Sequence, residues 1–141
     1  MISKIYRLKE NDVKKVLKHG KPFFSYGIVL NYKNNNLDFN RFSIIISGKN
    51  TKGGVERNFF RRKFFDYLDK NGYTGVFEKK TSALTNNNEV LQKTGQKILI
   101  HYDCVFLLKK QIKLEKNNLE SINSFENDIK FLLKKLQIPK K

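Results

Sequence analysis

Residues 53–68, GGVERNFFRRKFFDYL, place four basic and five aromatic side chains within sixteen positions. Arginine carries a planar guanidinium group whose fixed N–H donors grip a phosphate in a bidentate way. Three arginines within six positions therefore favour contact with a nucleic-acid backbone. The alternative is an ordinary solvated helix face on which the arginines have no ligand.

A helical projection separates the two kinds of side chain in this segment. Successive residues of an α-helix are rotated by about 100°, so residues three and four apart share a face. The apolar stripe, which we expect to face the core, consists of Phe60, Phe64, Tyr67 and Leu68. The adjoining polar arc consists of Arg57, Asn58, Arg61 and Arg62. Phe59 and Lys63 are left on the third side.

The loop before this helix, GKNTKGG, adds two cations. Lys49 and Lys52 lie close to the helix N-terminus, where unpaired backbone N–H groups also attract anions. The loop does not match a nucleotide-binding P-loop. That motif requires glycine at the position of Ser43 and Ser or Thr at the position of Asn50.

The sequence offers no set of residues for autonomous cleavage of RNA. His19 and His101 lack the spacing of a zinc site. Asp103 stands alone in a strand, so no carboxylate pair is available for metal-assisted phosphodiester hydrolysis. Cys104 has no obvious partner base. We therefore expect no catalytic residue and no metal site in this chain.

The charge balance also predicts a polyanionic partner. The chain has 29 Lys and Arg against 13 Asp and Glu, a net charge of +16 and a pI near 9.9. Residues 1–70 hold 16 basic and 6 acidic side chains, and residues 71–141 hold 13 and 7, so the whole body is cationic. A lysine-rich surface that only confers solubility is the alternative, and the clustered arginines argue against it.

Length and composition predict a single domain over residues 1–141. Cys104 is the only cysteine, so no intramolecular disulfide can form and a reducing compartment is expected. No apolar run approaches the roughly 20 residues of a membrane span, and the N-terminus lacks a signal-peptide core. We expect a cytoplasmic protein without a membrane partner.

Local patterns predict the order α-β-β-α-β-α. A short helix begins at a cap on Asn11 or Asp12 and ends where Gly20 takes a left-handed conformation. Strands over 23–32 and 39–47 form an antiparallel hairpin, and the arginine-bearing helix spans residues 55–70.

The second half begins with a polar excursion at 73–97, which is predicted to be an insertion. A strand over 97–109 follows. The last helix, capped by Ser124, has its apolar stripe at Phe125, Ile129, Leu132, Leu133 and Leu136. These elements predict an α+β sandwich with helices packed on one sheet.

In this order the segments RLKENDVKKVLKHGKPF, RFSIIIS, RNFFRRKFFDYL and YDCVFLLKK resemble the protein subunit of bacterial ribonuclease P. The resemblance covers residues 5–68 and 98–137. It implies a fold of the ribosomal protein S5 domain 2-like type, with one mixed sheet and a left-handed βαβ crossover, an exception to the usual handedness.

The resemblance also implies a function. The family's protein binds a catalytic RNA and the 5′ leader of precursor tRNA, and the RNA with its Mg²⁺ ions performs the hydrolysis. Arg57, Asn58, Arg61 and Arg62 match the family's RNA-contacting signature. The leader cleft between the first helix and the sheet would include Val13, Leu17, Tyr26, Val29 and Asn31. The alternative function is that of a structural ribosomal or rRNA-binding protein.

Two departures from the family pattern affect these expectations. Phe59 stands where the signature has arginine, and Val13 and Leu17 stand where the family often has aromatic side chains. Aromatic faces stack on single-stranded bases. The nearby aromatic residues that could replace them are Phe23, Phe24, Tyr26 and Tyr32.

Overall fold

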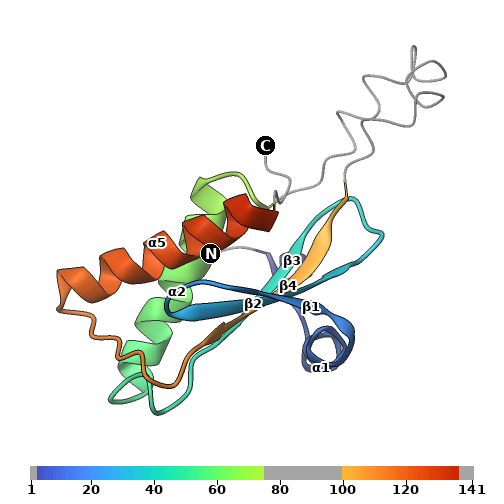
Figure 1. The fold of residues 1–141 in the computed structure, drawn as a ribbon. Helices are drawn as coiled ribbons and strands as arrows, with labels where there is room; N and C mark the ends of the chain where they lie inside the picture. The colour runs from blue at the N-terminus through green and yellow to red at the C-terminus, as the bar shows by residue number, and fades with distance from the viewer. Residues whose placement is uncertain (1–2, 75–99, 137–141) are drawn as a thin grey trace, which may run out of the picture.

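The computed structural model describes residues 3–74 and 100–136, which fold into one sheet with three α-helices (Figure 1). After a 3₁₀ turn at Lys4–Tyr6, the elements are α1 (Glu10–His19), β1 (Lys21–Phe24), β2 (Ile28–Asn34), β3 (Arg41–Ile45), α2 (Gly54–Lys70), β4 (Tyr102–Leu108) and α5 (Leu119–Leu136). Apart from Tyr73 and Thr74, the expected insertion at 73–97 lies outside the described residues.

The sheet is mixed, as predicted, with the strand order β1-β2-β4-β3. β2 pairs antiparallel with both β1 and β4, whereas β3 pairs parallel with β4. Because α2 lies between β3 and β4 in the chain, these three elements form a βαβ crossover between neighbouring strands. The left-handedness of this crossover stays a prediction.

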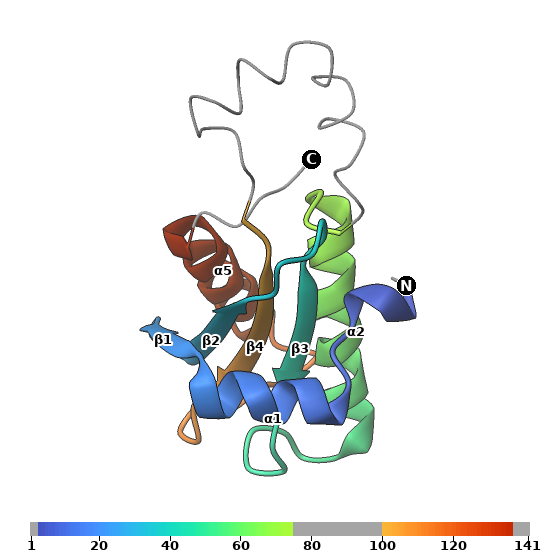
Figure 2. The same ribbon diagram turned by 90° about the vertical axis from the view of Figure 1, so that its right-hand side faces the viewer.

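The helices cover both faces of the sheet. α1 crosses one face, where it contacts β2 and β4, and α2 and α5 lie together on the other (Figures 1 and 2). The main core fills the layer between the sheet and α2 and α5. Its fully buried side chains include Leu30, Phe42, Phe60, Phe64, Phe106, Ile129, Leu132 and Leu133.

The single strand predicted over 23–32 is wrong, because the chain turns at residues 25–27. The Ser25 hydroxyl accepts a hydrogen bond from the Ile28 N–H at 3.2 Å and donates to the Ile28 carbonyl at 3.0 Å. Gly27 then passes so close to α5 that a Cβ atom would lie 2.9 Å from Oδ2 of Asp128. The turn divides the segment into β1 and β2.

The predicted hairpin between 23–32 and 39–47 is also wrong, since β4 lies between β2 and β3. β4 has helices on both sides and buries residues of both faces, such as Val105 and Phe106. A strand covered on both faces favours the centre of a sheet. Sequence proximity favoured the hairpin, but burial of the apolar β4 determines the order.

The ends of α1 differ from the prediction. Lys9 is the N-cap, and Asn11 and Asp12 lie inside the first turn. Gly20 ends the helix in an extended conformation, with φ of −80°, and not in the left-handed region. Glycine is needed there for space, because a Cβ atom would lie 2.5 Å from the Val16 carbonyl oxygen and 2.6 Å from that of Tyr32.

α5 begins five residues before the predicted cap at Ser124. Asn118 precedes it, and its side-chain oxygen accepts hydrogen bonds from the N–H groups of Glu120, at 2.9 Å, and Ser121, at 3.3 Å. The predicted apolar stripe is confirmed. Phe125, Ile129, Leu132 and Leu133 are buried, and Leu136 packs against the core.

The predicted apolar stripe of α2 is confirmed as well. Phe60, Phe64 and Leu68 are fully buried, and Tyr67 packs half-buried against the core. Phe65 is also buried, which the stripe did not include. α2 contacts two elements, since Phe60 meets Phe125 of α5 and Phe64 meets Phe106 of β4, with ring centroids 5.1 and 4.9 Å apart. Its buried arc is therefore wider than a single stripe.

We expect Phe64→Ala to lower the free energy of unfolding by about 3–5 kcal/mol, because it leaves a cavity at the contact with β4. Urea unfolding followed by circular dichroism measures this change. The matched control is Phe131→Ala, since Phe131 is 52% exposed on α5 and its loss should have little effect. Equal losses for the two variants would contradict this assignment of the core.

Candidate nucleic-acid interface

The polar arc of α2 carries cations that no acid of the described residues neutralises. Asn58, Arg61 and Arg62 are exposed, and Arg57 is half-buried. Within residues 3–74 and 100–136, the ion pairs involve Lys14 and Arg41 and none of the α2 arginines. The guanidinium groups on this arc are therefore available to an external anion.

Arg57 joins the arc to the loop that precedes the helix. Cβ atoms built on Gly48 and Gly54 would lie 3.7 and 3.8 Å from its two terminal nitrogens. The guanidinium thus lies along the backbone of residues 48–54. Lys49 and Lys52 of the same loop are exposed. Helix and loop together present one cationic surface, as the sequence predicts.

Asn50 anchors this loop in the fold. Its side chain is 1% exposed and makes four hydrogen bonds. The amide nitrogen donates to the carbonyl oxygens of Lys109 and Ile112, both at 2.8 Å. The amide oxygen accepts from the N–H and the hydroxyl of Ser47, both at 3.0 Å. All the hydrogen-bonding positions of the amide are used.

Three further hydrogen bonds tie the region of the loop to the connection between β4 and α5, residues 109–118. The Leu114 N–H donates to the Asn50 carbonyl at 2.7 Å, and the Lys113 ammonium donates to the Lys49 carbonyl at 2.7 Å. The Lys116 N–H donates to the Glu56 carboxylate at 3.2 Å. Glu56, the acid in the first turn of α2, is thus directed at this connection.

Sequence reasoning missed the role of Asn50 and considered it only as a mismatch to the P-loop motif. The available signal was weak: an amide in a glycine-rich loop indicates a turn, but its partners lie about sixty residues further along the chain. Those partners become visible only once β3 and β4 are paired.

Phe59 stands where the family signature that this sequence resembles has an arginine, and its side chain packs on the body of the protein. Its ring is half-buried, meets Phe60 edge-on with centroids 5.1 Å apart, and packs against the core. The Lys63 ammonium lies 5.6 Å from the ring centroid, within range of a cation–π contact. This position therefore adds packing to the helix and does not add to the arginine arc.

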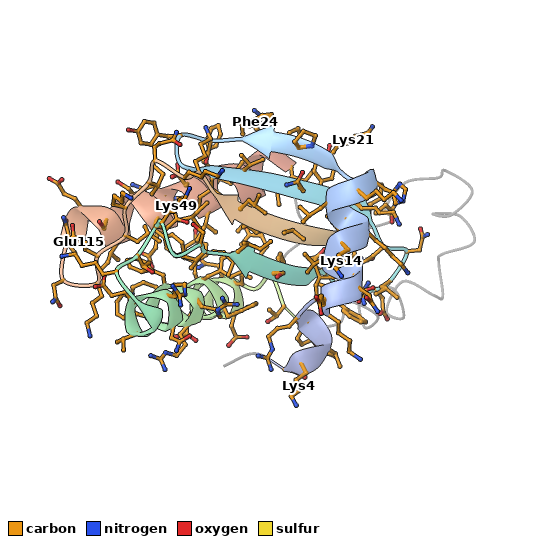
Figure 3. All side chains as sticks on the ribbon, turned by 90° about the horizontal axis from the view of Figure 1, so that it is seen from below. Lys4, Lys14, Lys21, Phe24, Lys49 and Glu115 are labelled. Carbon is orange, nitrogen blue, oxygen red and sulfur yellow. The ribbon has the colours of Figure 1, made fainter. Side chains whose placement is uncertain are left out.

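On the opposite face of the sheet, α1 leaves an apolar row uncovered. In the strand register, Val29 is opposite both Phe24 and Leu107, and Leu107 is opposite Ile45, so these four share one face. Phe24 is 57% exposed and Ile45 is 37% exposed. Figure 3 shows Lys21 near the end of α1 and Phe24 further along β1, away from the helix.

The structure brings four of the five predicted cleft residues to this face. Val29 and Asn31 point towards the α1 side of β2, because the alternate residues Ile28 and Leu30 are buried in the main core. Val13 is half-buried on α1, and Leu17 is 42% exposed. The face of the sheet beside α1 is therefore partly exposed and largely apolar.

Tyr26 is separated from those four residues. It lies in the turn between β1 and β2 and lines a hollow with residues of α5, which covers the other face. Among the aromatic residues expected to help, Phe23 and Tyr32 also pack on the other face, with ring centroids 5.0 Å apart. Phe24 is the one of the four that lies in the apolar row beside α1.

An ion-pair network fixes α1 to the sheet. Arg41 of β3 donates to both carboxylate oxygens of Asp103 on β4, at 2.8 and 2.6 Å, and also reaches Asp12 of α1 at 3.5 Å. The hydrogen bond with Asp103 raises the pKa of the Arg41 guanidinium despite partial desolvation. Asn35 donates to Asp103 as well, at 3.0 Å. Asp103, which looked isolated in the sequence, is thus a structural residue.

The described parts of the chain show neither a metal cluster nor a membrane helix. No group of three or more His, Cys, Asp or Glu in them could hold a metal ion. None of the helices in those parts combines the length and the apolar character needed to cross a bilayer.

Burial raises the pKa of the Cys104 thiol well above its usual value. Cys104 therefore packs in the core as an unreactive thiol.

We expect Asn50→Ala to lower the free energy of unfolding by about 3 kcal/mol, because the Ile112 carbonyl and Ser47 lose their hydrogen bonds to the amide, and the Lys109 carbonyl keeps only the one from the Ile112 N–H. Chemical denaturation measures the loss. The matched control is Asn58→Ala, since Asn58 is exposed on α2 and should change stability by less than about 0.5 kcal/mol. If Asn50→Ala is as stable as this control, the loop is not anchored in the way described.

Comparison with known proteins gives one family. The family model described as Ribonuclease P matches residues 2–103. Among curated proteins, no relative matches the sequence.

Solved structures with the same fold come from the same family. One is a Staphylococcus aureus RNase P protein mutant with defective mRNA degradation activity, at 19% identity and a TM-score of 0.62, with 96% of this chain and 92% of that chain covered. Another is the RNase P protein from Thermotoga maritima, at 20% identity and a TM-score of 0.61, with 92% and 96% covered. At these identities the likeness establishes the fold.

Proposed function

Since the chain belongs to the ribonuclease P family, as a protein subunit of that endoribonuclease with a role in 5′ maturation of precursor tRNA, we propose that it acts through two RNA-binding faces. One face is the arginine arc of α2 with the loop before it. The other is the exposed apolar row of the sheet together with the neighbouring side of α1. The observation that carries the proposal is the exposed, unneutralised arginine arc.

The α2 face suits the catalytic RNA. Arg61 and Arg62 hold out two guanidinium forks, and Asn58 adds a donor and an acceptor. Arg57 extends this arc onto the loop with Lys49 and Lys52. Such contacts go to phosphates, which position the protein on a folded RNA without reading its sequence. The loop is anchored by buried hydrogen bonds, so it needs little ordering when it binds.

The α1 face suits the single-stranded 5′ leader. A leader strand lying on the sheet beside α1 would meet Phe24, whose exposed ring can stack on a base, and Val29 and Leu17, which offer apolar contact. Asn31 supplies a hydrogen-bonding group at the same place. Phe24 can provide the stacking surface for a leader base, because α1 contains no Phe, Tyr or Trp.

In this account the chain contributes binding and charge, and the RNA contributes the chemistry. The described residues bring together no set of metal ligands, so we assign the Mg²⁺ ions of the hydrolysis to the RNA. The protein lowers the repulsion between two polyanions, the catalytic RNA and its substrate, by placing cations beside them. A cytoplasmic location, where precursor tRNA is processed and Cys104 stays reduced, fits this role. The family match favours this function over that of a structural ribosomal protein.

The double variant Arg61→Ala/Arg62→Ala should bind the catalytic RNA more weakly and with a smaller salt dependence. Each lost phosphate contact reduces the slope of log K against log [salt] by about 0.7–0.9, so two contacts should reduce it by about 1.4–1.8. Filter binding at several salt concentrations measures the slope. The control Lys130→Ala/Lys134→Ala removes the same charge from exposed positions of α5. Identical slopes for the two double variants would place the RNA elsewhere.

Phe24→Ala should weaken the affinity of the assembled ribonucleoprotein for precursor tRNA by about 5-fold or more, because one stacked base contributes about 1–3 kcal/mol. Affinity for mature tRNA, which has no leader, should not change. Phe131→Ala serves as the control with a similarly exposed ring. A loss that is equal for precursor and mature tRNA would mean that Phe24 does not contact the leader.

A further inference from the structure

A hollow lies at the edge of the α2 face, and the proposed function does not use it. It has a volume of about 330 Å³ and lies between the β1–β2 turn, the connection 109–118 and the start of α5. Tyr26, Lys113, Asn118, Glu120 and Asp128 are among its lining residues. The hollow is large enough for one nucleoside and is partly open to solvent.

Tyr26 is the most exposed large hydrophobic residue among the described residues, at 82%. Nothing in the fold requires an aromatic residue there, since the turn is made by Ser25 and Gly27. Gly27 also keeps the turn close to the connection, because a Cβ atom would lie 3.0 Å from the Ile112 side chain. An exposed tyrosine ring beside a hollow lined by both polar and apolar side chains offers a face on which a base can stack.

The interior of the hollow suits a base better than a phosphate. Asp128 and Glu120 line it, and carboxylates repel a phosphate group but accept hydrogen bonds from the amino groups of bases. Asn118 and Ser121 add neutral hydrogen-bonding groups.

The rim of the hollow suits the phosphates. Lys113 lines the hollow and is exposed, and Lys110 and Lys116 are exposed on the same connection. The Lys113 ammonium is held 2.7 Å from the Lys49 carbonyl oxygen, so this rim continues directly into the loop before α2. In Figure 3, Lys49 and Glu115, one residue from each segment, lie at the same end of the sheet. A phosphate path can therefore run from the arginine arc to the hollow.

We propose that this hollow binds a single unpaired nucleotide of the catalytic RNA, with its base stacked on Tyr26 and its flanking phosphates on Lys113 and Lys116. The proposal rests on the proposed function, because it concerns the same RNA. It adds a site at which the protein recognises an unstacked base, which the arginine arc cannot do.

The first test is Tyr26→Ala, compared with Tyr26→Phe, in binding of the catalytic RNA without substrate. The exposed position makes both variants compatible with folding. We expect Tyr26→Ala to bind about 5- to 100-fold more weakly with an unchanged salt slope, since a stacked base and not a phosphate is lost. Tyr26→Phe should keep most of the affinity. Phe131→Ala, the control for an exposed ring on α5, should bind like the wild type.

The second test is Lys113→Gln/Lys116→Gln, which should reduce the salt slope by about 1.4, at roughly 0.7 for each phosphate contact on a single strand. Lys130→Gln/Lys134→Gln on α5 is the matched control. Circular dichroism of each variant verifies that the loop remains folded.

The outcomes separate this inference from the proposed function. If Arg61→Ala/Arg62→Ala weakens RNA binding while Tyr26→Ala and Lys113→Gln/Lys116→Gln bind like the wild type, the hollow is not an RNA site and the proposed function stands. If Tyr26→Phe loses as much affinity as Tyr26→Ala, stacking is excluded and the proposal is overturned. If the wild-type protein binds no catalytic RNA, the proposed function fails, and this inference fails with it.

Discussion

The amide of Asn50 is the interaction on which the α2 face depends. It is buried with all four of its hydrogen bonds made, two to the loop after β3 and two to the connection after β4. Without it, the loop and the connection would be joined only by the hydrogen bonds from Leu114 to the Asn50 carbonyl, from Lys113 to the Lys49 carbonyl and from Lys116 to Glu56. A buried amide with every bond satisfied specifies one arrangement of these segments, because any other arrangement leaves polar groups without partners.

The parallel pairing of β3 and β4 makes this interaction possible. Ile45 lies opposite Leu107 at the end of both strands, so the loop and the connection leave the sheet at the same edge. α2 returns from that loop along one face of the sheet, and its arginines point away from the core that Phe60 and Phe64 form. At the other end of the strands, the pair of Arg41 and Asp103 fixes α1 on the opposite face. The two faces that we propose bind RNA thus depend on one strand pair.

Much of this arrangement is predictable from local patterns. The stripe of α2, the stripe of α5 and the exposed arc of Arg61 and Arg62 follow from helical periodicity alone. Local patterns do not contain the strand order, since burial on both faces moves β4 into the position that sequence proximity assigned to β3. They also do not place Tyr26, because a turn of three residues divides what looks like one strand. The role of Asn50 could not be predicted either, because its partners Lys109 and Ile112 lie about sixty residues further along the chain.

On the proposal above, this chain assists an RNA-catalysed reaction and does not perform it. The most direct measurement is the rate of precursor-tRNA cleavage by the cognate RNA as a function of Mg²⁺ concentration, with and without the protein. We expect the protein to shift the curve to lower Mg²⁺, because its cations replace part of the metal ions that screen the two RNAs, and to cleave nothing on its own. An unchanged curve would mean that the protein does not assist the RNA, and cleavage by the protein in the absence of the RNA would mean that the chain is itself a nuclease.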